Sequence, residues 1–364
     1  MKKQDLMKYM GSMQQVASVR PVTYQEGRAG GMRGYEVKNG EMTFQVLADK
    51  CLDVGSLSYR GINMTFLSKP GLQGRGHYDT NGEEAIHSIM GGLFFTAGLE
   101  NICAPCTIEG TDYPMHGRIR TTPGEHLGAD AYWENGAYHL SVSGEMREAA
   151  LFGENMVLRR NISSVYGEKS ITVTDEIENE SYRTEPMMIL YHINLGYPFL
   201  DENIRLYIPT GKVTARDAKA EGHEARYDRM DPPKDNEPEY VFIHDLRTDQ
   251  DGNTRILAVN EPLGLGLEIA YNTAFLPYFM EWKSVASGDY VIGLEPANSS
   301  VYGRPYHEAR GDLHRMEPFA REKNVLKFTV LDGAEEIRKA VAEMEEQFEG
   351  LLPNDANPGS GQIF

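Results

Sequence analysis

Residues 156–177 read MVLRRNISSVYGEKSITVTDEI, and this stretch decides the fold class. In Met156–Ile162 and again in Ser170–Ile177, apolar and polar residues alternate over a short run. Such alternation predicts β-strands that bury one face. Between the two runs, Tyr166-Gly167-Glu168 predicts a tight turn. The stretch therefore predicts two consecutive antiparallel strands.

The same pattern recurs along most of the chain. Further runs of this kind are Thr43–Leu47, His139–Ser143, Leu265–Tyr271 and Val325–Val330. Turn signals separate them at 38–40, 134–136 and 251–253. The 37 glycines and 18 prolines fit many turns and few long helices. We therefore predict an all-β protein, built as a large two-sheet antiparallel β-sandwich in one domain over residues 1–350.

One segment near the C-terminus breaks this pattern. Apolar residues recur there at helical spacing at Ile337, Val341, Met344 and Phe348. We predict a surface helix over Ala334–Glu349, with Asp332 as its cap and Gly350 as its stop. Residues 351–364 are polar and rich in Gly, Pro and Asn, which predicts a flexible tail. Between Arg216 and Pro238, charged and proline-rich sequence predicts an excursion from the sandwich.

Composition excludes several classes of partner. The net charge of −18 argues against a nucleic acid or an anionic membrane, because both require basic surfaces. No stretch approaches the roughly 18 apolar residues of a membrane span, and the first residues lack the apolar run of a signal peptide. We therefore expect a cytoplasmic protein. Composition does not predict its oligomeric state.

The cysteines predict neither a disulfide framework nor a metal site. There are three of them, and only Cys103-Ala104-Pro105-Cys106 has the spacing of a redox or metal motif. No second such pair exists, so ordinary buried or turn cysteines are the simpler interpretation. The chain also lacks a nucleophile elbow, an H-E-x-x-H pair and a phosphate-binding loop. We expect no cofactor and no metal.

Glu295 is the first candidate for catalysis. Gly293-Leu294-Glu295-Pro296 follows the strand-like run Tyr290–Ile292, so Glu295 lies at or just beyond a strand end. Pro296 favours extended backbone at Glu295, and Gly293 leaves room for a ligand. An exposed glutamate at a strand end is the alternative interpretation.

His192 and Asn194 are the polar members of the long apolar run Met187–Pro198. Alternation places both side chains on one face of a central strand, where they can line a pocket together. A core histidine with a structural asparagine is equally compatible with the run.

His116-Gly117-Arg118 is a third candidate, because a His and an Arg beside a glycine can both contact the oxygens of one ligand. A plain surface turn is the alternative. Trp282 offers a flat face for a sugar ring, or it packs as a core or rim residue. Arg304, shortly after Glu295, offers another polar contact, or it is a solvated loop residue.

Together these pieces resemble the aldose 1-epimerase (galactose mutarotase-like) superfamily, and within it the DUF4432 branch. The pieces that carry the resemblance are 52–55 (LDVG), 91–93 (GGL), 96–99 (TAGL), 116–118 (HGR), 191–196 (YHINLG), Leu276-Pro277 with Trp282, and 293–296 (GLEP). They follow one another from about residue 20 to about residue 332. The resemblance implies a β-supersandwich with a monosaccharide site in a cleft.

The resemblance also implies roles for individual residues. It makes Glu295 the general base and His192 the general acid of sugar ring opening, and it makes His116 a group that binds and polarises the sugar oxygens. The family's substrate-binding aspartate has no clear match here, and Asp245 is the candidate. Arg118, Asn194 and Arg304 would then hold hydroxyl groups, and Trp282 would support a ring face.

The implied reaction interconverts sugar anomers by acid–base catalysis. Glu295, ionised near neutral pH, would take the proton of the anomeric hydroxyl, and protonated His192 would give one to the ring oxygen. Two alternatives stay open. One is a sugar-binding or sugar-sensing protein without catalysis. The other is an isomerase or epimerase of an acidic or oxidised sugar, whose carboxylate would pair with Arg118, Arg120 or Arg304.

Overall fold

The computed structural model describes residues 3–74 and 82–348. Its largest sheet has eight strands in the order β11 (Glu125–Glu134), β12 (Ala137–Ala149), β13 (Asn155–Val165), β14 (Ser170–Asn179), β25 (Arg321–Asp332), β21 (Leu265–Asn272), β20 (Asn253–Asn260) and β17 (Ile204–Tyr207). Neighbouring strands are antiparallel. The stretch that decided the fold class forms β13 and β14, as predicted.

The second sheet carries the candidate site. Its six antiparallel strands run in the order β18 (Thr210–Ala215), β19 (Tyr240–Leu246), β22 (Tyr278–Ala286), β23 (Asp289–Ala297), β16 (Met188–Leu195) and β8 (Phe94–Leu99). A five-stranded sheet is formed by β1 (Ala17–Thr23), β2 (Arg33–Asn39), β3 (Met42–Leu47), β4 (Asp53–Tyr59) and β5 (Ile62–Asn63). The shorter strands are β6 (Phe66–Leu67), β7 (Gly91–Gly92), β9 (Cys106–Ile108), β10 (Thr111–Tyr113), β15 (Glu185–Pro186) and β24 (Arg315–Met316). The prediction of an antiparallel all-β protein is confirmed.

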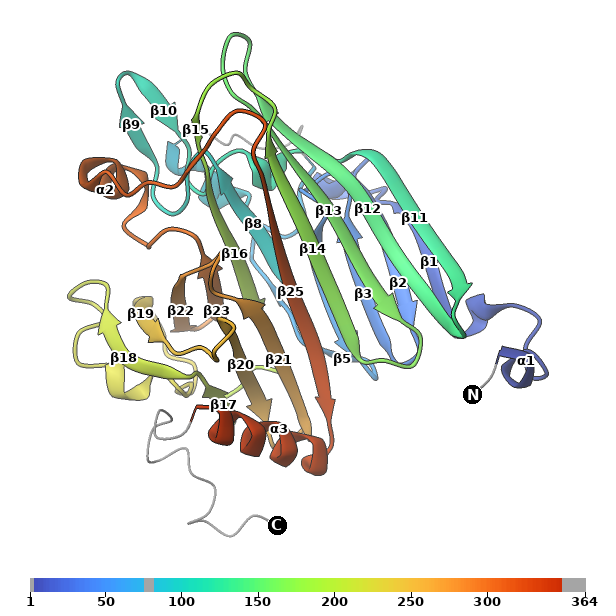
Figure 1. Cartoon of the computed structure of the whole chain (residues 1–364). Helices are drawn as coiled ribbons and strands as arrows, with labels where there is room; N and C mark the ends of the chain where they lie inside the picture. Colours follow the sequence, from blue (N-terminus) through green and yellow to red (C-terminus); the bar gives the residue numbers. More distant parts are fainter. Residues whose placement is uncertain (1–2, 75–81, 349–364) are drawn as a thin grey trace.

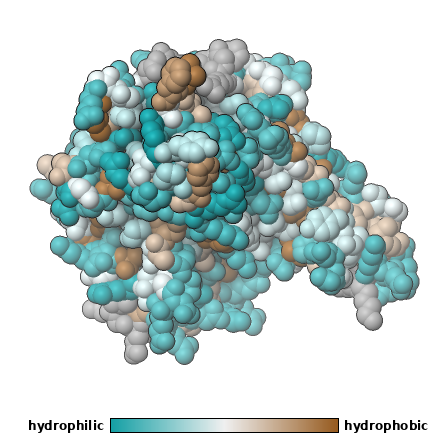
Figure 2. All heavy atoms as spheres, turned by 45° about the horizontal axis from the view of Figure 1, so that its top comes forward, coloured by the Kyte–Doolittle hydropathy of each residue, from teal (hydrophilic) through white to brown (hydrophobic). Residues whose placement is uncertain are grey.

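Apolar side chains from the sheets form the main core between them. Phe94 of β8 stacks on Phe328 of β25 with ring centroids 5.8 Å apart, which joins the six- and eight-stranded sheets. Burial of such apolar surface is the main source of folding free energy. The outer surface is different. Figure 2 shows a mostly hydrophilic face with small, separate hydrophobic groups, in keeping with the net charge of −18.

A charged network also crosses this core. Arg160 of β13 is 1% exposed and lies 2.7 Å from Asp53 of β4 and 2.6 Å from Asp175 of β14. The Tyr191 hydroxyl of β16 donates to Asp175 at 2.6 Å, and Thr96 of β8 donates to Asp53 through its hydroxyl and its backbone N–H. Buried charges need such complete pairing to be tolerated. The network therefore ties β8 and β16 to both the five-stranded and the eight-stranded sheet.

The predicted C-terminal helix is present as α3 (Ala334–Gln347), which lies beside the ends of β20, β21 and β25 (Figure 1). Its apolar face packs in a cluster with Leu257 and Val259. The predicted cap was wrong, because Gly333 occupies that position without a side-chain bond and Asp332 binds Arg60 instead. Gly350 and the predicted tail, 351–364, lie outside the described residues. The extent of the domain, 1–350, stays a prediction.

The other helices are short: α1 spans Lys3–Leu6 and α2 spans Gly303–Arg310. Among the residues that the structure describes, no helix is long and apolar enough to cross a membrane. The predicted excursion is confirmed, since residues 216–239 connect β18 to β19 with only the 3-10 turn Glu224–Arg226 between them.

Candidate functional site

His192 and Glu295 lie opposite each other on neighbouring strands. The antiparallel pairs Leu190↔Ala297 and Ile193↔Leu294 bracket them, so the register of β16 and β23 brings them together. His192 Nε2 is 3.1 Å from Glu295 Oε1, and the two residues are 7% and 4% exposed. Glu295 lies within β23 and is buried, so the interpretation as an exposed strand-end glutamate was wrong. An imidazole and a carboxyl at this distance can exchange a proton.

Aromatic rings hold the His192 imidazole in place. Phe95, its cross-strand neighbour on β8, stacks on it with centroids 4.5 Å apart. Trp282 of β22 meets it edge-on at 5.4 Å. Gly293 lies beside this group, where a Cβ would come within 2.9 Å of Glu295 Oε1, 3.1 Å of His192 Cε1 and 3.1 Å of Trp282 Cε3. Only glycine leaves the space that these three side chains occupy.

His116 reaches the same place from a loop. Its ring centroid is 5.7 Å from that of His192, and its backbone has a φ of 58°, in the left-handed region. Two backbone bonds hold it there: its N–H donates to Cys103 O at 3.0 Å, and its carbonyl accepts from Gly98 N–H at 3.1 Å. At Gly117 a Cβ would lie 2.0 Å from Gly98 O. The loop can pass only with glycine at that position.

The CxxC segment supports this loop. Asn101, which is fully buried, donates to Ala104 O at 3.0 Å and to Pro114 O at 2.9 Å. Cys103 and Cys106 are free thiols. Within residues 3–74 and 82–348, no group of three or more His, Cys, Asp or Glu side chains is arranged to hold a metal ion.

Two imidazole nitrogens at the site have unused hydrogen-bonding capacity. Nδ1 of His116 and Nδ1 of His192 are both buried and have no hydrogen-bond partner among the described residues. Unsatisfied buried polar atoms are rare and costly in folded proteins, and they often mark functional positions. They fit hydrogen bonding to a ligand hydroxyl.

Burial reverses the protonation expected from ordinary pKa values. Removal from water raises the pKa of Glu295 to about 8, with the nearby Glu239 carboxylate raising it and Arg216 lowering it. Burial lowers the pKa of His192 to about 4. It also lowers the pKa of His116, together with the charges of His192 and Arg120. At neutral pH the His192–Glu295 pair therefore holds one proton, and that proton rests on the carboxyl.

Arg216 and Glu239 are site residues that motif reading missed. Glu239 accepts the indole N–H of Trp282 at 2.8 Å and lies 3.2 Å from Arg216 Nη2. They stand at the two ends of the 216–239 excursion, and the Arg216 N–H donates to Val241 O at 2.9 Å. The sequence did contain a signal for these two residues, because the two ends of an excursion that connects paired strands must lie side by side.

Arg118 and Arg304 meet at a different residue, Glu100. Arg118 forms an ion pair with the Glu100 carboxylate, and Arg304 donates to the Glu100 carbonyl at 2.7 Å. Arg304, in the first turn of α2, also lies 4.0 Å from the Tyr113 ring centroid. Both guanidinium groups therefore have partners within the protein.

The remaining predicted residues differ in their surroundings. Asn194 is buried and donates to the His192 carbonyl at 2.7 Å, so it shapes the strand that carries the imidazole. Asp245 is exposed on β19, where it pairs in register with Lys212. β22 and β23 lie between β19 and β16 in the sheet.

Residues 29–330 match the model of one protein family, described as a domain of unknown function (DUF4432). The chain belongs to the DUF4432 family. This confirms the resemblance drawn from the sequence motifs. No curated protein has a matching sequence.

Solved structures show where this DUF4432 fold belongs. A "putative aldose 1-epimerase" from Klebsiella pneumoniae is similar with a TM-score of 0.86 at 19% identity, over 92% of this chain and 88% of that one. The galactose 1-epimerase of Lactobacillus acidophilus is similar with a TM-score of 0.55 at 14% identity, over 87% and 99%. A galactose mutarotase-like protein of Clostridium acetobutylicum has a TM-score of 0.56 at 12% identity, over 86% and 99%. The fold is therefore galactose mutarotase-like.

Proposed function

We propose that this DUF4432 protein is a carbohydrate isomerase of the aldose 1-epimerase type, which interconverts the anomers of a monosaccharide. The observation that carries the proposal is the 3.1 Å approach of His192 Nε2 and Glu295 Oε1 in a buried setting. Anomer exchange requires one proton donor and one acceptor that can trade roles. The pair supplies both with a single proton.

The chemistry runs without a net change in the pair. His192 Nε2 takes the proton of the anomeric hydroxyl while the Glu295 carboxyl gives its proton to the ring oxygen, and the C1–O5 bond breaks. The open-chain aldehyde turns about its C1–C2 bond. The C5 hydroxyl then attacks the other face of C1, and the two residues reverse their roles. If substrate binding first moves the proton to His192, the same steps run with the donor and acceptor exchanged.

Neighbouring groups are placed to hold the sugar. His116 Nδ1, buried and unpaired among the described atoms, fits a hydroxyl or the developing charge on an oxygen. Trp282 offers a flat ring that Glu239 fixes through the indole N–H. Arg216 and Glu239 add a donor and an acceptor at the rim. Arg118, Arg304 and Asp245 remain candidates for contacts with the substrate in this proposal.

The test is saturation-transfer NMR between α and β anomers across neutral hexoses, pentoses and uronic acids. We expect faster exchange with wild type, lost in Glu295→Gln and in His192→Asn. A matched control exists on the same sheet: His244 and Glu281 form another buried His–Glu pair, 3.2 Å apart, on strands β19 and β22. The side chains of this pair are 0% exposed, and His244 packs against Tyr227 and Phe279 instead of His116 and Trp282. A sugar has no access to them, so Glu281→Gln should leave exchange unchanged.

Two results would overturn the proposal. No acceleration of any sugar, with binding retained in wild type and both variants, would favour a sugar-binding protein. Configuration changes at a carbon other than C1 would favour a different isomerase.

A further inference from the structure

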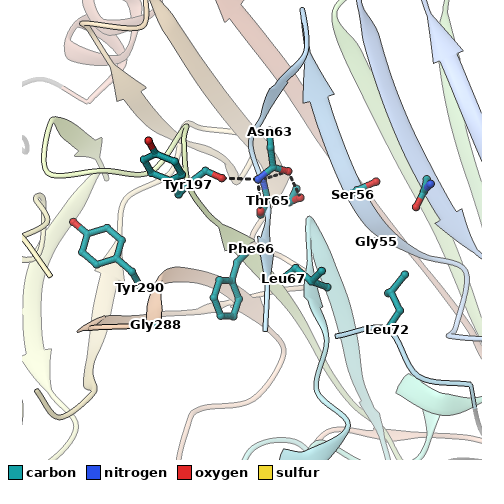
Figure 3. A pocket seen from close by; sticks show the side chains of 11 residues that line it. Gly55, Ser56, Asn63, Thr65, Phe66, Leu67, Leu72, Tyr197, Gly288 and Tyr290 are labelled. Carbon is teal, nitrogen blue, oxygen red and sulfur yellow. Dashed lines mark hydrogen bonds between the residues drawn. The ribbon is translucent and has the colours of Figure 1, made fainter. Parts of the chain in front are cut away.

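A concave region lies further along the strands that carry the His192–Glu295 pair. It is a pocket of about 550 Å³, drawn in Figure 3. Its walls come from β3 and β4, from the β5–β6 segment, from the loop after β16 and from the β22–β23 hairpin. Tyr197 follows His192 by five residues, and Tyr290 precedes Glu295 by five. At about 3.3 Å per residue, these pocket residues lie roughly 16 Å from the pair.

The chemistry of the lining is neutral and amphipathic. None of the eleven described residues that line the pocket is charged, although 25% of the chain is. Phe66, Tyr197 and Tyr290 supply aromatic rings, as Figure 3 shows. Lys69 and Asp289, which lie beside Gly288, form an ion pair with each other. Such a lining does not compensate the charge of a phosphate or a carboxylate.

Hydrogen-bonding groups stand among these rings. The hydroxyls of Ser56 and Tyr197 make no hydrogen bond within the described residues. Gln45 Oε1 accepts from Tyr24 Oη at 2.8 Å, which orients the amide and leaves its NH₂ group for a ligand. Flat apolar faces beside hydroxyl and amide groups match the alternating C–H and O–H surface of a sugar.

The pocket is fixed before any ligand arrives. Asn63 Nδ2 donates to Thr65 O and to Tyr197 O at 2.7 Å each, and Oδ1 accepts from the Thr65 hydroxyl at 3.1 Å (Figure 3). Tyr290 Oη donates to Asp231 O at 2.8 Å. Tyr197 nevertheless keeps 74% of its surface exposed. A preformed wall lowers the entropy cost of binding, and an exposed ring offers area to bury.

We propose that this pocket is a binding site for a neutral saccharide, separate from the His192–Glu295 pair. The saccharide stacks on Tyr197 and Phe66 and bonds to Gln45 and Ser56. The site does not require that the protein catalyse anomer exchange.

The experiment titrates the whole protein, with ¹³C-methyl leucine, using maltose as the neutral probe and sodium glucuronate as the charged one. Leu67 and Leu72 line the pocket, and their methyl signals can be assigned from Leu67→Ile and Leu72→Ile. We expect saturable shifts of both signals with maltose and much weaker ones with glucuronate. Tyr197→Ala should weaken maltose binding about tenfold or more.

Two further variants keep the test decisive. Tyr182, 88% exposed on the loop between β14 and β15, is the matched control, and Tyr182→Ala should bind maltose as wild type does. Gln45→Glu keeps the side-chain shape but removes the amide donors, and it should also weaken binding if Tyr197→Ala fails to fold. The proposal would be overturned if maltose caused no saturable shift of the two leucine signals. It would also be overturned if both Tyr197→Ala and Gln45→Glu bound maltose as tightly as wild type, or if wild type bound glucuronate as tightly as maltose. Anomer exchange in Tyr197→Ala should equal that of wild type, so failure of this site and failure of the proposed activity are observed separately.

Discussion

Replacement of Glu295 by glutamine should stabilise the folded protein, by an amount that grows with pH. The Glu295 carboxyl is 4% exposed, and burial raises its pKa from 4.5 to about 8. Below about pH 4.5 the group is protonated in both the folded and the unfolded chain, so it costs nothing. Between about pH 4.5 and pH 8 the carboxyl ionises in the unfolded chain but not in the folded one. The free energy of unfolding therefore falls as pH rises. At 1.36 kcal/mol per pKa unit, the full cost is about 5 kcal/mol above pH 8.

Chemical unfolding at several pH values measures this cost. The free energy of unfolding of Glu295→Gln minus that of wild type removes the contribution of all other titrating groups. We expect this difference to rise by about 4 kcal/mol between about pH 5 and about pH 9. A pH-independent change in stability caused by altered packing does not affect how this difference varies with pH.

His192→Asn supplies an internal check of opposite sign. Burial lowers the pKa of His192 from 6.5 to about 4, so the folded state resists protonation and loses stability as pH falls through this window. The advantage of His192→Asn over wild type should therefore grow by about 3 kcal/mol from about pH 7 to about pH 4. A pH-independent difference in both variants would refute the reasoning that burial controls these two groups.

Three further predictions follow from the same geometry. The rate of anomer exchange, measured by saturation transfer, should depend on pH as a bell with apparent pKa values near 4 and 8, because the pair is active when it holds one proton. An apparent pKa near 6.5 would contradict this. Tyr191→Phe should lower the free energy of unfolding by about 2 kcal/mol in urea, because Asp175 loses a buried 2.6 Å bond; a neutral result would show that the network does not depend on it. Gly117→Ala should lower exchange at least about tenfold with an unchanged circular dichroism spectrum, because its Cβ would lie 2.0 Å from a backbone oxygen and displace His116. Full activity of that variant would remove His116 from the site.

Alternation along single strands predicted five of the eight strands of the largest sheet, namely β12, β13, β14, β21 and β25, because side chains on successive residues face opposite ways. It also placed His192 and Asn194 on one face. It could not bring Glu295 to His192, since the pairing of β16 with β23 joins residues 103 apart in sequence. The family resemblance supplied that convergence. Pairing of distant strands depends on the whole topology, which local pattern does not contain.

The wrong helix cap has a physical cause that the local sequence does not contain. Asp332 resembles a helix cap by composition, but Arg60 and the Tyr59 hydroxyl compete for its carboxylate. The partners of the two candidate arginines were equally hidden from the sequence, since Arg118 pairs with the Glu100 carboxylate and Arg304 donates to the Glu100 carbonyl. In each case the charged group is satisfied by a residue far away in sequence, and no spacing rule could have named it.

The two faces of the six-stranded sheet carry different groups where β8 pairs with β16. On the outer face, Phe95 stacks on His192. On the inner face, the adjacent cross-strand pair Thr96 and Tyr191 is bonded to Asp53 and Asp175, which Arg160 joins. This explains why Asp53 of the LDVG motif and Tyr191 of the YHINLG motif are polar although neither reaches the site. A buried ion-pair network has fixed geometry, so it holds the two strands in register and limits the movement of the imidazole on their other face. In the proposed mechanism, the charged core thus positions the acid–base pair from behind.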